Sequence, residues 1–411
     1  MSAGSRPSPS EPTPLWTSAF TALLAAQACF GYAFSTFFLL PTFLSRELGA
    51  SATQVGWVMS AAPAAVIVLL PITGHWIDRL GRKRFLLLGA LLMTVSCALF
   101  PLVTSVGPLL YALRVLQAIA FSMSFAAGGA LAVDMAPPER MGQAMGLFGL
   151  TFLAMNGVAG PTVELLSQHA GWPAAFGVSA VAAAASAALT LKLRDAFVRP
   201  SAAELATLRI SDRSPVAIRP LVVMASVGLA LGAMFNFAQL YAAELGIADV
   251  SWFFLAYAGT AVVIRAGFGH LLDDWGLRRV SIASLTLYVM VVAATIRLDA
   301  FGLIAVGSLL GISHGSFYPA FSALMLSGAS ARMRAQVVAN VQAAFSVGGT
   351  ASAVLGFIAD RFGFGAVFAI AAASLVCALC LLITERPVRR SEESLKTRPL
   401  PDAPAVSVAD A

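Results

Sequence analysis

Ionisable side chains occur inside long apolar stretches of this sequence, as Arg114, Glu164, Arg265 and His314. Such groups are costly in a low-dielectric interior and are usually kept there because they have a function. An arginine can bind an anion, and a carboxylate or an imidazole can take up and release a proton. We therefore predict ion or proton chemistry at a buried site, with Arg114, Glu164 and His314 as candidates for coupling to protons.

The spacing of Arg114 and Glu164 suggests a pair. Arg114 lies 24 residues before a turn centred near Pro138, and Glu164 lies 26 residues after that centre. In a helical hairpin the two side chains reach nearly the same depth, because each residue advances a helix by about 1.5 Å. We predict that they form an ion pair in which Glu164 titrates. The alternative is that Glu164 faces water near the end of its helix while Arg114 lines a cavity alone.

Polar side chains in the same stretches are candidates for the wall of a binding cavity. The predicted cavity residues are Gln27, Tyr32, Gln117, Asn156, Asn236, Gln239, Tyr257, Arg265, His314 and Tyr318. The sequence has no nucleotide-binding loop and no H-E-x-x-H motif, and no further Cys or His supports the Cys377–Cys380 pair as a metal site. We therefore predict no enzyme, no cofactor and no metal site, and energy from an ion gradient.

The composition indicates which solvent surrounds these stretches. Of the 411 residues, 59% are hydrophobic and 11% are charged. A soluble domain carries about a quarter charged residues, so the composition predicts an all-α membrane protein embedded in a lipid bilayer. The net charge is +6, but the basic residues lie in short loops between apolar stretches. Their position argues against a nucleic-acid partner.

Twelve apolar stretches approach or exceed the length that crosses a bilayer, which takes about 20 residues of helix. In the first half they lie at roughly 16–44, 54–76, 85–104, 108–134, 142–166 and 173–193. In the second half they lie at roughly 217–243, 250–271, 280–297, 302–327, 335–358 and 364–384.

Polar segments divide the chain and orient it. We predict a tail at 1–14, a six-helix bundle at 15–193, a linker at 194–216, a second bundle at 217–385 and a tail at 386–411. With the N-terminus in the cytoplasm, 21 of the 26 Lys and Arg residues fall in cytoplasmic segments and three in external loops. Because basic residues stay on the cytoplasmic side, we predict a multi-pass protein of the plasma (bacterial inner) membrane with both termini cytoplasmic.

The two halves repeat each other. Residues 74–84 read GHWIDRLGRKR after the second stretch, and residues 269–279 read GHLLDDWGLRR after the eighth. Residues 171–176 and 363–368 form a second matching pair, and the two offsets are 195 and 192 residues. Parallel repeats of this kind typify secondary transporters, whose binding site lies near the midplane between the halves.

Three segments carry a resemblance to a known family. Residues 74–84 resemble the loop signature G-x-x-x-D-R-x-G-R-[RK] of the major facilitator superfamily. Residues 114–117 resemble its R-x-x-Q motif, except that Ala118 stands where Gly is usual. In the fifth stretch, Gly149, Gly157, Gly160 and Pro161 resemble the motif of 12-span antiporters, with 164–165 departing from its final glycines.

The resemblance implies the major facilitator fold, twelve transmembrane helices in two pseudo-symmetric six-helix bundles. It also implies a charge relay that latches the halves together in the outward-open state. The implied latch residues are Gly74, Asp78, Arg79, Gly81, Arg82 and Asp134, with Asp273 and Arg278 in the second half. Because Leu326 aligns with Asp134, we expect the second latch to be weaker.

The function implied is secondary active transport by a monomer. The chain would export a small organic solute by alternating access in exchange for protons. The alternative is a proton-coupled symporter or facilitator that imports a small metabolite. A membrane sensor or receptor would need a signalling domain, for which the linker and tails are too short.

Overall fold

All regular elements of the described chain are helices. A computed structural model describes residues 15–193, 218–247, 249–267, 275–327 and 334–384, so the predicted linker and both tails lie outside the described residues. The first half contains α1 (Ser18–Ser35), α2 (Leu40–Arg46), α3 (Ala52–Leu80), α4 (Arg82–Leu99), α5 (Pro108–Asp134), α6 (Met141–Ala170) and α7 (Trp172–Lys192), and the 3-10 segment η1 (Thr36–Leu39) joins α1 to α2.

The second half contains α9 (Ile218–Glu244), α10 (Ser251–Gly267), α12 (Leu277–Ala294), α13 (Ala300–Ser327), α14 (Arg334–Thr350), α15 (Ser352–Phe362) and α16 (Phe364–Thr384). Among the described residues eleven helical stretches are long and apolar enough to span a membrane, and α10 is a shorter apolar helix at the twelfth predicted span. The predicted all-helical membrane fold is confirmed, with a helix at every predicted span.

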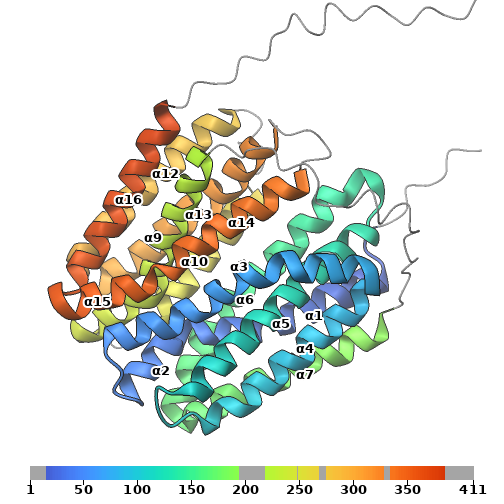
Figure 1. The fold of residues 1–411 in the computed structure, drawn as a ribbon, viewed down its shortest axis with the longest axis horizontal. Helices are drawn as coiled ribbons and strands as arrows, with labels where there is room; N and C mark the ends of the chain where they lie inside the picture. The colour runs from blue at the N-terminus through green and yellow to red at the C-terminus, as the bar shows by residue number, and fades with distance from the viewer. Residues whose placement is uncertain (1–14, 194–217, 248, 268–274, 328–333, 385–411) are drawn as a thin grey trace, which may run out of the picture.

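Each half is a bundle of consecutive helices, and the two bundles lie side by side (Figure 1). The seam between them is formed by α3 against α14 and α15, and by α6 against α10. One end of the molecule, which we call the terminal end, contains the starts of α1 and α9 and the ends of α7 and α16 (Figure 1). The other end, where α2 leads into α3 and α9 leads into α10, is called the opposite end.

The sequence repeat recurs in the backbone. Gly81 stands between α3 and α4 with φ +99°, and Gly276 precedes α12 with φ +80°. Gly171 stands between α6 and α7 with φ +78°, and Gly363 between α15 and α16 with φ +80°. Glycine adopts this left-handed region without steric cost, which lets one helix end and the next begin within a single residue. The halves therefore share these tight junctions at the offsets seen in the sequence.

Within the second half, helices touch backbone to backbone. A Cβ on Gly348 of α14 would overlap the carbonyl oxygen of Ala225 on α9, and one on Gly228 would overlap that of Phe345. A Cβ on Gly311 of α13 would likewise overlap the carbonyl oxygen of Tyr257 on α10. Small residues allow such close packing in a membrane, where lipid supplies no hydrophobic drive between helices. These helix pairs form a tightly packed second bundle.

Candidate functional site

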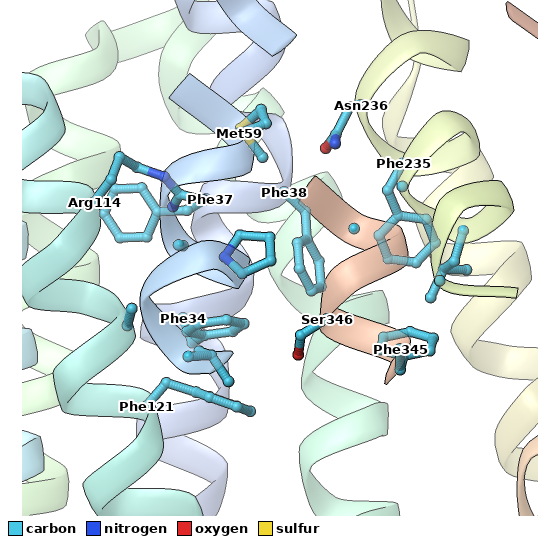
Figure 2. Close-up of a pocket in the computed structure, with 18 of the residues that line it drawn as sticks. Phe34, Phe37, Phe38, Met59, Arg114, Phe121, Phe235, Asn236, Phe345 and Ser346 are labelled. Carbon is cyan, nitrogen blue, oxygen red and sulfur yellow. The ribbon is translucent and has the colours of Figure 1, made fainter. Parts of the chain in front are cut away.

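A cavity of about 270 Å³ lies between the two bundles. Its wall comes from α1 with η1, α3 and α5 of the first half and from α9 and α14 of the second half (Figure 2). Large apolar side chains dominate the wall. These side chains are Phe34, Phe37, Phe38, Met59, Phe121, Phe235 and Phe345.

Polar groups are few in the wall, and Arg114 carries its one charge among the described lining residues. The Arg114 side chain is 6% exposed. Its Nη1 donates to Oε1 of Gln117 at 2.6 Å, and its Nε has no hydrogen-bond partner. Figure 2 shows the side chain extending from α5 toward Phe37. The cavity therefore contains a buried cation that the described lining residues do not neutralise.

The second half adds three polar side chains to the wall, Asn236, Gln342 and Ser346. Nδ2 of Asn236 donates to Oγ of Ser352 at 2.9 Å. The hydroxyl of Tyr318 donates to Oε1 of Gln342 at 2.8 Å. Tyr318 therefore connects the wall to a second polar layer behind it.

His314 is the centre of that layer. Its ring lies 5.8 Å from the ring of Tyr318, 6.0 Å from that of Tyr288 and 6.2 Å from that of Tyr257, measured between centroids. The side chain is 6% exposed, and its Nδ1 has no hydrogen-bond partner. Arg265 lies nearby, with Nε 3.4 Å from the carbonyl oxygen of Gly315. A titratable imidazole is thus held among tyrosines one layer behind the cavity.

At the opposite end the two halves close over the cavity. The ring of Phe38 lies 5.1 Å from that of Phe235 and 6.2 Å from that of Phe254. Farther out, Oγ1 of Thr42 donates to Oε1 of Gln239 at 2.7 Å, and Nε2 of Gln239 donates to the carbonyl oxygen of Phe38 at 2.8 Å. An aromatic layer and a hydrogen-bonded layer therefore seal this side.

Two carboxylates complete the closure, each on the first backbone N–H groups of a helix in the other half. Glu164 of α6 accepts from the N–H of Val250 at 3.2 Å and of Ser251 at 3.0 Å, where α10 begins. Asp360 of α15 accepts from the N–H of Ala52 at 3.0 Å and of Thr53 at 2.8 Å, where α3 begins. The first N–H groups of a helix have no partner within it and favour negative charge.

Comparison with known proteins identifies the architecture. The model of the Major Facilitator Superfamily matches residues 21–248 and 222–409. The chain belongs to this superfamily. The nucleoside transporter NupG, solved as a D323A mutant, has the same fold with a TM-score of 0.74 at 13% identity, covering 89% of this chain and 99% of that one.

Sequence relatives within the superfamily include proteins named for drug resistance. Multidrug resistance protein MdtG of Yersinia enterocolitica is 27% identical over 84% of this chain and 87% of its own length. Multidrug resistance protein 3 of Bacillus subtilis is 29% identical over 31% of this chain. The match to that protein spans only 24% of its length.

The predicted ion pair of Arg114 and Glu164 is wrong in this conformation of the superfamily fold. Glu164 binds the start of α10, and Arg114 binds Gln117 one turn along its own helix. Equal depth in the hairpin does not fix the direction in which a side chain points, and Glu164 points toward the other half of the molecule. Two backbone N–H groups at a helix start satisfy a buried carboxylate without a cation.

The superfamily signature at the terminal end forms one ion pair between described residues. Arg82, at the start of α4, pairs with Asp134, at the end of α5. Gly74 and Asp78 lie on α3, but their side chains are outside the described residues, as is all of Asp273. Arg79 is exposed at the end of α3. In the second half, Nη2 of Arg278 donates to the carbonyl oxygens of residues 382 and 383 at 3.1 and 2.9 Å.

The antiporter-like glycines lie partly at the seam. A Cβ on Gly157 would lie 2.9 Å from Cβ of Ala258, and one on Gly160 would lie 3.2 Å from Cβ of Phe254. Both contacts are with α10 in the other half. A Cβ on Gly149 would meet no atom within 4 Å. The helix α6 continues unbroken through Pro161.

Of the ten polar residues predicted to line a cavity, Asn236 lines this one. Two others form hydrogen bonds inside the first half. The hydroxyl of Tyr32 bonds Oγ1 of Thr162 at 2.9 Å, and Asn156 accepts from Ser35 at 2.5 Å. Gln27 is buried away from the cavity, and neither atom of its amide group has a partner. The remaining six are Gln117 beside Arg114, Gln239 in the seal, and Tyr257, Arg265, His314 and Tyr318 behind the wall.

The sequence interpretation missed the aromatic wall and Asp360. Phe34, Phe37 and Phe38 share one face of a helix, at spacings of three and four residues. That stripe could have indicated a cavity-facing surface. Asp360 gave no such signal, because its partners are backbone groups some 300 residues earlier.

Proposed function

We propose that this protein is a secondary active transporter that exports a small organic solute by alternating access, in exchange for protons. The supporting observation is the one-sided closure of the cavity. Between residues that the structure describes, the hydrogen bonds joining the halves all come from the level of the cavity or from the opposite end. A cavity between two bundles that meet at one end is the arrangement expected for one stage of alternating access.

The direction of transport follows from the orientation we propose. The excess of Lys and Arg at the terminal end supports placing that end in the cytoplasm. The structure then corresponds to a transporter sealed outside, with its site facing inward to load a solute. Relatives named for multidrug resistance support export. A nucleoside transporter has the same fold, and import by symport is the alternative to be tested.

We further propose that the outward-open state is held by the latch at the terminal end. Arg82 and Asp134 already form an ion pair within the first half. Their pairing fixes the start of α4 against the end of α5. The second half can dock on the resulting charged surface when the terminal end closes. Asp78 and Asp273 are the proposed acids of the signature loops in the two halves.

The proton is proposed to bind at His314. An imidazole can take up and release a proton on a ring nitrogen, and Nδ1 of His314 has no hydrogen-bond partner. His314 is connected to the cavity through Tyr318 and Gln342, so its charge can respond to solute binding. Glu164 is a weaker candidate, because in this conformation both of its oxygens are bound at the outer seal.

The function is tested with the purified protein in inside-out proteoliposomes that have an acidic interior. The solutes are naphthalene-1-sulfonate, its uncharged sulfonamide and naphthylmethyl-trimethylammonium. We expect at least one of the three to accumulate when the gradient is present, and to do so severalfold less without it. Accumulation of none, or accumulation only when protons enter together with the solute, would contradict proton-driven export.

The same vesicles test His314. His314→Gln keeps a hydrogen-bonding side chain but removes the titratable group, so we expect gradient-driven accumulation to disappear while downhill exchange of solute continues. Tyr241→Phe is a matched control, since Tyr241 bonds a carbonyl oxygen near the opposite end, away from the cavity. Survival of gradient-driven accumulation in His314→Gln would remove His314 as the proton carrier.

A further inference from the structure

The wall of the central cavity points to the chemical class of the solute. We propose that the solute is an amphipathic organic anion, an inference that rests on the proposed transport function. Its apolar body would pack against the phenylalanines of the wall, and its anionic group would bind Arg114.

Charge balance supports this inference. Arg114 is almost fully buried, its Nε is unpartnered, and no carboxylate occurs among the described lining residues. A buried charge without a counter-charge is costly. An anionic ligand supplies that counter-charge and can accept two parallel hydrogen bonds from a guanidinium group. An organic cation would instead be repelled by Arg114, and the described lining residues offer it no acid.

The remaining polar groups of the wall fit the same class. The carbonyl oxygen of Gln342 is already occupied by the Tyr318 hydroxyl, which leaves its amide hydrogens as donors. Ser346 adds a hydroxyl on the same helix, one turn along. The second half therefore offers donors to an oxygen-rich head group, while Phe34 and Phe345 offer flat apolar surface.

Binding to the purified transporter in detergent tests the class without requiring transport. The probes are the same three naphthalene compounds, which share a ring system and differ in charge. We expect the sulfonate to bind about tenfold more tightly than the sulfonamide, and the ammonium compound most weakly. In Arg114→Met the preference for the sulfonate should vanish, while sulfonamide affinity stays within about twofold.

Equal affinity for all three probes, tighter binding of the cation, or a preference that survives Arg114→Met would each overturn the inference. Arg114→Lys retains the charge but not the forked geometry, so a partial preference is expected there. Anion-selective binding without proton-driven export would reject the proposed function and keep this inference. The two failures are therefore distinguishable.

A second inference concerns the seal and rests on separate observations. We propose that Glu164 and Asp360 are positioning residues for the transport cycle, which together hold the opposite end closed. The two contacts are reciprocal: a carboxylate of each half binds the first turn of a helix in the other half. Opening this end must break both, and neither carboxylate belongs to the latch at the terminal end.

The surroundings of Glu164 favour an electrostatic attraction between its carboxylate and the start of α10. Glu164 is 9% exposed and lies at one side of a small polar pocket with Arg46 and Glu47. Its partners are the backbone N–H groups of Val250 and Ser251, whose bonds to an ionised carboxylate are roughly twice as strong as those to a neutral acceptor. An amide in place of the carboxylate keeps the shape and loses this attraction.

The molecule contains a matched control. Asp299 also caps a helix start, accepting from the N–H of Gly302 at 2.5 Å, but both residues belong to the second half. Asp299→Asn therefore weakens the same kind of contact without touching the seam. Glu47→Gln is a control for the pocket beside Glu164, because Glu47 bonds Trp172 within the first half.

Distances between spin labels report the state of the seal. With the four native cysteines replaced, labels at Ser105→Cys and Leu245→Cys span the halves at the opposite end, and labels at Glu139→Cys and Thr384→Cys span the terminal end. We expect Glu164→Gln and Asp360→Asn each to raise the ratio of open to closed opposite ends about tenfold. The terminal-end pair should move closer together in step.

Unchanged distance distributions in both variants would overturn the inference. An equal shift in Asp299→Asn would also overturn the inference, because the effect would then be a general loosening of helix ends. A merely structural role would lower the thermal stability of Glu164→Gln and Asp360→Asn. We expect both variants to keep their thermal stability while the distances between the labelled halves shift.

Discussion

Gly56→Val and Gly356→Val are expected to abolish transport while leaving the protein folded. A Cβ on Gly56 would overlap the carbonyl oxygen of Ser352, and one on Gly356 would overlap that of Ala52. Both contacts cross the seam between α3 and α15, so a side chain prevents closure of the opposite end. Overpacking of this kind costs about 3 kcal/mol, which corresponds to about a hundredfold loss of the closed state.

Two measurements check this expectation. Transport of the naphthalene probes into proteoliposomes should fall to background, and the spin labels at the opposite end should report the open distance. Gly149→Val is the control, because a Cβ on Gly149 meets no atom within 4 Å. Full transport in Gly56→Val would show that α3 and α15 need not approach this closely during the cycle.

Gly348→Val and Gly311→Val should instead destabilise the protein itself. Their clashes lie within the second bundle, α14 against α9 and α13 against α10. No rocking of the halves relieves such a clash, so the cost of about 1–3 kcal/mol falls on folding. We expect a lower melting temperature and loss of monodisperse protein in detergent.

A control for this pair is available on α10. Gly259→Val lies where a Cβ meets no atom within 4 Å, and it should leave the melting temperature nearly unchanged. If Gly348→Val were as stable as the native protein but inactive, α9 and α14 would have to separate during transport. The comparison with the seam glycines therefore shows which helix contacts move and which stay fixed.

The fold could be predicted from the sequence because its signal is local. A span of apolar residues must be helical in lipid, since each backbone group then finds its partner within the segment. The predicted spans 108–134 and 364–384 coincide with α5 and α16, and most others differ from the observed helices by a few residues at their ends. Span 16–44 is divided into α1, η1 and α2, and span 335–358 is divided into α14 and α15. The repeat was visible because its tight junctions need glycine at fixed places.

The site was less predictable because its partners are distant in sequence. The residues predicted to line the cavity are all polar, whereas the cavity wall consists mainly of phenylalanines, which cannot be told from ordinary core residues in a sequence. Asn156 and Tyr32 were expected at a cavity, but each finds a hydroxyl partner within the first half. Nothing local distinguishes a polar side chain that faces a cavity from one that bonds a neighbouring helix.

Glu164 is a second case in which the partners of a side chain could not be predicted from the sequence. Its depth could be read from the sequence, and its departure from the glycine of the antiporter motif marked it as unusual. Its partners could not be read, because any residue type supplies a backbone N–H. A carboxylate that binds a helix start leaves no trace in the sequence of the helix that it binds.

The two seal carboxylates also bear on the symmetry of the internal repeat. At the offset of 192 residues that relates Gly171 to Gly363, Glu164 corresponds to Gly356 and Asp360 corresponds to Gln168. The acids are therefore one helical turn out of register, although they bind equivalent helices in opposite halves. At this offset the two halves make equivalent seal contacts from different positions of the repeat. A comparison of the two repeats position by position would overlook both.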